Sequence, residues 1–404
     1  MPFYALYALL FADHGLSTAQ ISALLAIWSI TAFLLEVPSG AWADVVSRRL
    51  LLMLGGALTA SCFVIWTVLP GFSGFALGFL LWGAAGALQS GTFEALLYDE
   101  LDVRGDAGGY PRVLGFATAA AELAALLGIL AAAPLFEWGG YTLVGWTSVA
   151  AALVQTALAA SLPSAPRVVA VAPDGDALVD DDAPATRAGP IASYLGMLRS
   201  GIGEAVRYGP VRGGVLLAAL LYGLTATDEY FGLLAEDAGA STATVPLLVG
   251  LTVCGSLLGS TLASRTSGMR GRTMAIALII AGIALGSGSL IGGPGVIGLI
   301  GFALIGIGYG IVMNATVVTE ARLQETIAGP ARATVTSAAG LLSEVVALAI
   351  FAVVAIGSAA LPISATLALL ALPVVLSGVI APRWLPRKTS EHGTTRAAED
   401  RLPG

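Results

Sequence analysis

Two adjacent acidic residues, Asp228 and Glu229, interrupt an apolar stretch of the sequence in the run "TATDEYFGLL". A carboxyl group that is removed from water tends to hold a proton or to attract a cation. Neighbouring positions on a helix point about 100° apart, so at most one of the two side chains faces a given partner squarely. We expect this pair to hold a cationic substrate or to carry a proton. The structural alternative is a hydrogen bond between helices.

Four further polar side chains lie within other apolar stretches: Glu94, Glu122, Asn314 and Glu344. An ionisable side chain at the centre of a bilayer costs about 2.5 to 3.5 kcal/mol on insertion scales, so such groups usually face a cavity or a partner. We expect these four to be secondary sites for substrate or protons. For Glu94, an acid that reaches the membrane surface is an equal alternative.

The elements that must position these side chains are membrane helices. The chain has 404 residues, of which 57% are hydrophobic and 11% are charged, whereas soluble domains are about 25% charged. Apolar windows long enough to cross a bilayer recur along the chain. We predict an all-α polytopic membrane protein with twelve transmembrane helices, at residues 2–13, 18–43, 50–69, 73–98, 111–135, 141–162, 213–235, 244–265, 273–292, 295–320, 330–356 and 360–381.

The basic residues predict the orientation of these helices. If the chain starts inside the cell, all 19 lysines and arginines fall in the inner connections or the C-terminal tail. Basic residues concentrate on the cytoplasmic side of membrane proteins. We therefore predict a multi-pass protein of the cytoplasmic membrane with both termini in the cytoplasm.

An internal repeat predicts the domain organisation. Leu10–Ile27 aligns without gaps on Leu234–Leu251, and both stretches contain the pattern D-x-G-x-S-T-A. A parallel repeat of this spacing is typical of two bundles around a central site. We predict four segments: a six-helix bundle at 1–162, an acidic cytoplasmic linker with an interfacial amphipathic helix at 163–212, a second six-helix bundle at 213–381 and a cytoplasmic tail at 382–404.

The first window is too short to cross a membrane. Its twelve residues would rise about 18 Å as a helix, against about 30 Å for the hydrocarbon core. The offset that places Leu10 on Leu234 also puts the start of this helix before Met1. We expect a truncated first helix, or one that begins upstream.

The sequence carries few groups for catalysis or metal binding. Its two histidines, His14 and His392, lie at opposite ends of the chain, and its one lysine, Lys388, lacks the glycine that precedes it in a nucleotide-binding loop. Cys62 and Cys254 each lie alone in an apolar window. We predict no enzyme, no cofactor, no metal site and no nucleic-acid partner, and we expect a monomer.

The turn "GAWADVVSRR" between the second and third windows carries a family resemblance. With this turn and with twelve predicted helices in two homologous halves, the chain resembles the major facilitator superfamily. The signature loop of that superfamily is G-x-x-x-D-R/K-x-G-x-R/K-R/K. The spacing is one residue shorter, and Val45 and Ser47 depart from the pattern. Four positions match: Gly40, Asp44, Arg48 and Arg49.

The resemblance implies the major facilitator fold, with helices 1, 4, 7 and 10 lining a cavity. It also implies that the matching turn is a conformational latch, which holds the two halves together on the cytoplasmic side in the outward-facing state. The run "SGTFEALLYDEL" looks like a poorly characterised bacterial branch of the family.

By this resemblance we expect a secondary active transporter of a small organic solute, which works by alternating access in the lipid bilayer and is coupled to protons. Export is one option. The arginine common in helix 4 of drug exporters is absent, and their glycine-proline motif survives only with Ala133 before Pro134. The alternatives are a receptor or scaffold that transports nothing, and a membrane-embedded enzyme.

Overall fold

The computed structural model describes residues 1–163, 209–327 and 331–386. These residues form helices and contain no strand, so the all-α prediction is confirmed for this part of the chain. Most of the predicted linker, including its amphipathic helix, and the end of the C-terminal tail lie outside the described residues.

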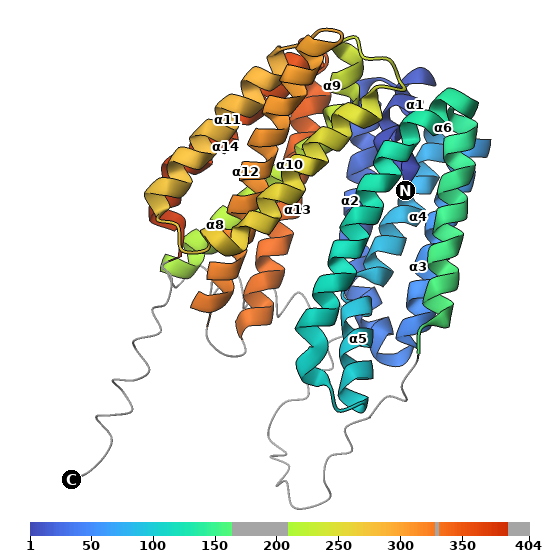
Figure 1. Cartoon of the computed structure of the whole chain (residues 1–404), viewed down its shortest axis with the longest axis vertical. Helices are drawn as coiled ribbons and strands as arrows, with labels where there is room; N and C mark the ends of the chain where they lie inside the picture. Colours follow the sequence, from blue (N-terminus) through green and yellow to red (C-terminus); the bar gives the residue numbers. More distant parts are fainter. Residues whose placement is uncertain (164–208, 328–330, 387–404) are drawn as a thin grey trace, which may run out of the picture. The chain divides into compact units, whose positions relative to one another are not determined.

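The helices of the N-terminal half follow the first six windows (Figure 1). They are the 3-10 helix η1 (Pro2–Ala5) and the α-helices α1 (Tyr7–Asp13), α2 (Thr18–Val45), α3 (Arg48–Val68), α4 (Phe72–Gln89), α5 (Thr92–Val103) and α6 (Tyr110–Ser161), with a short 3-10 turn, η2 (Ala107–Gly109), before α6.

The helices of the C-terminal half follow the last six windows. They are α8 (Gly209–Leu224), the 3-10 helix η3 (Thr225–Tyr230), α9 (Phe231–Asp237), α10 (Val245–Thr266), α11 (Gly271–Leu290), α12 (Val296–Thr326), α13 (Ala331–Gly357) and α14 (Ile363–Trp384). In the described part of the chain, nine helices are long and apolar enough to cross a membrane. The count of twelve stays a prediction.

Glycines break two of the long helical stretches. Within α6, Gly139 and Gly140 leave the helical conformation, and Gly140 has φ 59°. Only glycine adopts such values readily, and this kink is the boundary predicted between windows 111–135 and 141–162. The window 73–98 was predicted as one helix, but it is divided into α4 and α5 at Gly91, which has φ 65°.

Contacts between residues divide the chain into two compact units. Unit 1 comprises Met1–Gly196, Glu229–Gly250 and Phe351–Ile363, and unit 2 comprises Met197–Asp228, Leu251–Ile350 and Ser364–Gly404. The division therefore passes between Asp228 and Glu229, inside the seventh predicted window. The predicted bundle boundaries at 162 and 213 stay a prediction.

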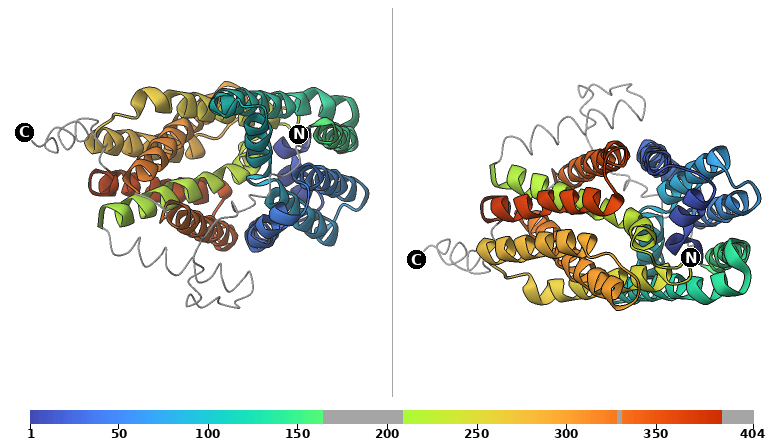
Figure 2. Two further views of the ribbon diagram at one scale, coloured as in Figure 1. Left: turned by 90° about the horizontal axis from the view of Figure 1, so that it is seen from below. Right: turned by 90° about the horizontal axis from the view of Figure 1, so that it is seen from above.

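Unit 1 is packed around α3. This helix lies against α4 and against the second part of α6 (Figure 2). The second part of α6 runs antiparallel to α3, since a Cβ on Gly145 would meet Thr67 near one end and a Cβ on Gly56 would meet Thr156 near the other. The α4 helix also packs against α2.

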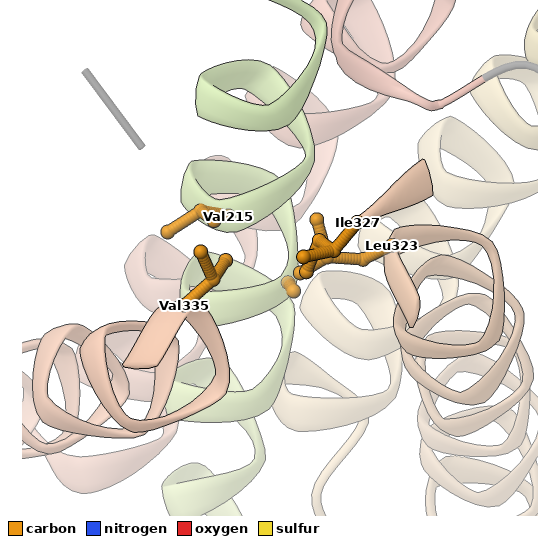
Figure 3. Packing of buried hydrophobic residues seen from close by; sticks show 5 residues of the cluster. Val215, Leu323, Ile327 and Val335 are labelled. Atoms are coloured by element: carbon orange, nitrogen blue, oxygen red, sulfur yellow. The ribbon is translucent and has the colours of Figure 1, made fainter. Parts of the chain in front are cut away.

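Unit 2 contains the helices α8, α11 and α12 and most of α10, α13 and α14. The α12 helix packs against α11 and α8. An apolar cluster joins α8, the end of α12 and α13 (Figure 3). Its members are Val215, Ala218, Leu323, Ile327 and Val335.

Candidate substrate and proton site

The acids Asp228 and Glu229 lie in a break between two α-helices. The α8 helix ends at Leu224, and the 3-10 segment η3 carries both acids before α9 begins. The hydroxyl of Thr225 donates to the carbonyl of Tyr222 at 2.6 Å, and that of Thr227 donates to Leu224 at 2.9 Å. Threonine and aspartate favour local hydrogen bonds over a regular α-helix, which explains the break.

Asp228 belongs to unit 2 and is bound there by a tyrosine. The hydroxyl of Tyr309, on α12, donates to Oδ2 of Asp228 at 2.9 Å. The same hydroxyl lies 3.3 Å from the carbonyl oxygen of Thr225. Asp228 is half-buried, so this bond holds the η3 segment to α12 at a partly desolvated carboxylate.

Tyr309 lies on a helix that is fixed by close packing. A Cβ on Gly255 of α10 would collide with the carbonyl of Gly306, and a Cβ on Gly259 would collide with that of Gly310. The backbones of α10 and α12 are therefore in direct contact, as small residues at four-residue spacing allow. This contact sets the position of α12, and with it the position of Tyr309.

Asn314 reinforces the same helix pair. Its side-chain amide donates to the carbonyl of Gly259 at 2.9 Å and lies 3.0 Å from the hydroxyl of Thr266. These bonds join α12 to α10 and show a structural function for Asn314. The predicted part in substrate binding stays a prediction.

Glu229 belongs to unit 1 and is bound by a different tyrosine. The hydroxyl of Tyr7, on α1, donates to Oε2 of Glu229. The next residue, Tyr230, is fully buried and shares a hydrogen bond of 2.7 Å with the hydroxyl of Ser22 on α2. As expected from the rotation along a helix, the two neighbouring carboxylates have different partners.

Tyr7 is part of an aromatic cluster that the sequence analysis missed. Its ring centroid lies 5.4 Å from that of Phe11, 5.8 Å from those of Trp66 and Phe79, and 6.3 Å from that of Trp82. Phe3, Tyr7 and Phe11 recur at every fourth position of the first window. This spacing places them on one helical face, and it was the available signal for the cluster.

The remaining predicted acids lie on three other helices. Glu94, in the first turn of α5, and Glu122, on α6, are exposed, and Glu344 on α13 is half-buried. Their participation in a substrate site stays a prediction.

An acidic group lies at one end of unit 1, where the predicted windows 2–13 and 213–235 end. Burial raises the pKa of Glu236, at the end of α9, and the negative charges of Asp13 and Asp237 raise it further. Asp13 also accepts a hydrogen bond of 2.6 Å from the hydroxyl of Tyr141. Both aspartates belong to the repeated D-x-G pattern, so the repeat places acids at this end twice.

A family model described as Major Facilitator Superfamily matches residues 1–349. The chain belongs to the Major Facilitator Superfamily. The suspected resemblance is thereby confirmed, and membership in this superfamily implies a multi-pass membrane transporter rather than an enzyme. A search of curated protein sequences gives no match.

Solved structures of three transporters share the fold of this superfamily member. The nucleoside transporter NupG is 14% identical with a TM-score of 0.67, covering 99% of this chain and 94% of its own. A D-xylose-proton symporter is 15% identical with a TM-score of 0.68, covering 96% and 93%. A bacterial homologue of the human lysosomal transporter Spinster is 14% identical with a TM-score of 0.66, covering 96% and 95%. At these identities the likeness shows the fold alone.

The turn that resembles the signature loop of the superfamily is bound within unit 1. Arg48, at the start of α3, donates to the carboxylate of Asp99 and, at 2.9 Å, to the carbonyl of Ala95, both on α5. Arg49 donates to the carbonyl of Leu162, beyond the end of α6, at 3.3 Å.

Two other latch residues, Gly40 and Asp44, belong to α2, but their surroundings lie outside what the structure describes. The latch therefore stays a prediction for all four residues.

The corresponding turn of unit 2 is held in the opposite way. Arg322, a residue of α12 that is 6% exposed, donates to the carbonyls of Ser267 and Met269 in the turn between α10 and α11. In unit 1 the turn supplies the arginine, whereas in unit 2 the turn supplies the acceptors. The sequence analysis assigned no function to Arg322.

Proposed function

We propose that the protein carries a small organic solute across the cytoplasmic membrane by alternating access, and that protons drive this transport. The observation that supports the proposal is the break in the seventh window, where a tyrosine binds each of two adjacent acids. In transporters, discontinuous helices commonly form the sites for substrates and coupling ions. Glu122, Glu344 and Glu94 are secondary candidates in the same proposal.

The tyrosine bonds suggest how a proton acts on the helices. Hydrogen bonds to an ionised acceptor are about twice as strong as neutral ones. A proton on Asp228 weakens the bond that Tyr309 donates, and a proton on Glu229 weakens the bond that Tyr7 donates. Each protonation thereby loosens one attachment of η3, and we propose that this loosening permits the helix movements of the transport cycle.

One structural neighbour is named a D-xylose-proton symporter and another a nucleoside transporter. The first name supports proton coupling as a process that this fold accommodates. Neither name supplies the solute of this chain, because the identities are 15% and 14%. We further propose a monomer with both termini in the cytoplasm, two bundles bounded near residues 162 and 213, and a latch at Gly40, Asp44, Arg48 and Arg49.

The test is solute transport by the purified full chain in proteoliposomes under an imposed proton gradient. A broad solute screen with a gradient of either sign identifies the solute and shows whether export or import is driven. We expect Asp228→Asn and Glu229→Gln each to lower proton-driven flux at least about tenfold, the loss expected when one hydrogen bond to a charged group, of about 1.5 to 3 kcal/mol, is removed.

The matched control is Asp102→Asn, which removes an exposed carboxylate in the last turn of α5. This control should leave proton-driven flux unchanged. Undiminished flux in both the Asp228 and the Glu229 variants would contradict the assignment of these acids.

A further inference from the structure

Three aromatic rings in unit 1 converge from separate elements and are only half-buried. They belong to Tyr4 on η1, Trp28 on α2 and Trp82 on α4. The centroid of Trp82 lies 6.3 Å from that of Trp28 and 6.5 Å from that of Tyr4. The rings of these residues therefore form an aromatic group with accessible surface, which we call the aromatic rim.

Fully buried rings support the aromatic rim from behind. Trp66 and Phe79 are at most 1% exposed, and their centroids lie 5.6 and 6.1 Å from that of Trp82. The indole nitrogen of Trp66 donates to the carbonyl of Phe75 at 3.1 Å, which fixes the orientation of this ring. Trp66 and Phe79 therefore hold the ring of Trp82 in a fixed position, and the accessible part of the aromatic rim is fixed with it.

One tyrosine, Tyr7, connects this rim to a carboxylate. Trp82 and Tyr7 have centroids 6.3 Å apart, and the Tyr7 hydroxyl donates to Glu229. The sequence that forms this part of unit 1 adds no basic side chain, because residues 1–47, 50–103 and 229–250 contain no lysine or arginine. Aromatic faces and negative charge therefore occur together.

We propose that the transported solute is an organic cation with an apolar body, bound by the aromatic rim and by the charge of Glu229. The face of a tryptophan or tyrosine ring attracts a cation, most strongly where water is excluded. The carboxylate balances the charge of the solute, and the rings cover its apolar part. This inference rests on the proposed transport function and names the chemical class of its solute.

The first experiment compares the charge of three aromatic compounds of similar size. Binding of tetraphenylphosphonium, a permanent cation, to the purified full chain is measured by equilibrium dialysis, beside neutral triphenylphosphine oxide and anionic tetraphenylborate. We expect the cation to bind at least about tenfold more tightly than the neutral compound, because both cation–π attraction and the carboxylate favour it. Equal binding of all three probes overturns the inference.

The second experiment changes the rim. Trp82→Leu should weaken tetraphenylphosphonium binding about tenfold, whereas Trp82→Phe, which keeps a ring, should weaken it less. Glu229→Gln should remove most of the preference for the cation over the neutral compound. The control is Trp146→Leu, a tryptophan of α6 that is 48% exposed, and its binding should match that of the unchanged protein.

Failure of this inference can be distinguished from failure of the proposed function. If the solute screen finds proton-driven flux of a neutral or anionic solute but no preference for the cation, only the inference is overturned. If no solute of any charge moves under either gradient, the proposed function fails as well. Should Trp82→Leu not fold, as judged by size-exclusion chromatography, the charge series and Trp82→Phe still decide the question.

Discussion

Helices α2 and α4 of unit 1 and helices α10 and α12 of unit 2 occupy corresponding places in the sequence repeat. The offset that places Leu10 on Leu234 also places Trp28 on Thr252 and Trp82 on Gly306. In unit 1 these positions hold two indole rings with centroids 6.3 Å apart. In unit 2 a Cβ on Gly306 would lie 3.5 Å from the Cα of Thr252. At these two positions the contact is therefore made by side chains in unit 1 and by backbone in unit 2, although α2 and α4 also approach closely at Gly83, where a Cβ would lie 2.8 Å from the carbonyl oxygen of Trp28.

This difference shows that the two repeats have diverged at the contact. The unit 1 pair carries two half-buried indole rings at these positions, whereas the unit 2 pair is in backbone contact at its glycines and holds Tyr309 beside Asp228. A duplicated scaffold keeps the helix positions while the residues at the contact diverge. Function must therefore be argued from the residues of each unit and not from the shared fold.

The largest effect is expected from adding one methyl group to the glycine contact. In Gly310→Ala the new Cβ collides with the carbonyl of Gly255, so α10 and α12 must separate. We expect a loss of about 3 kcal/mol in the free energy of unfolding, at the upper end for overpacking. Thermal unfolding in detergent measures the change.

The repeat itself supplies the control for this substitution. Gly86 corresponds to Gly310, and a Cβ at Gly86 meets nothing within 4 Å. Gly86→Ala should be neutral or raise stability by up to about 1 kcal/mol, because alanine is the better helix former. Equal destabilisation by both substitutions would remove the distinction between the two helix pairs.

A smaller effect is expected at the arginine that holds the turn of unit 2. Arg322→Met leaves the carbonyls of Ser267 and Met269 without their donor, and we expect a loss of about 2 kcal/mol in unfolding free energy. Tyr98 stands at the corresponding position of α5 and is 48% exposed. Tyr98→Phe should change thermal unfolding very little, so that similar shifts in both variants would speak against the contrast between the turns.

The smallest effects concern the two tyrosine–acid pairs and are best measured as coupling energies. A double-mutant cycle of Tyr309→Phe with Asp228→Asn, and another of Tyr7→Phe with Glu229→Gln, should each give about 1 kcal/mol. The crossed cycle of Tyr7→Phe with Asp228→Asn should give much less, because Tyr7 bonds the other acid. A crossed coupling as large as the paired ones would show that the two acids act as one group.

The sequence predicted the helices well where composition is uniform and poorly where it changes within a few residues. Averaging over a window of about 19 residues hides a short interruption. For this reason the break at Gly91 and the 3-10 segment Thr225–Tyr230 were both predicted as continuous helix. The signals were nevertheless present, as a Ser-Gly-Thr run and a Thr-Ala-Thr-Asp run, both typical of helix ends.

The candidate site was predicted in its acids but not in their partners. Asp228 and Glu229 stood out because charge is rare in apolar windows. Tyr7 lies 222 positions from Glu229 along the chain, and no local pattern connects them. Asn314 was expected to take part in a substrate site, which stays a prediction, and its amide also bonds α10. This partner could not be predicted, because one helix position does not show which neighbour its side chain meets.

By itself, the sequence determined the class of this protein: a helical membrane protein with a repeated half and with acids in apolar windows. These features follow from the cost of burying polar groups in lipid, which acts on every residue in the same way. Only the tertiary structure decided that neighbouring acids bond tyrosines of different helices, and that the rings of Trp28 and Trp82 meet in unit 1 where the backbone at Gly306 meets Thr252 in unit 2. Such pairings depend on packing between residues far apart in the chain, which composition and periodicity do not contain.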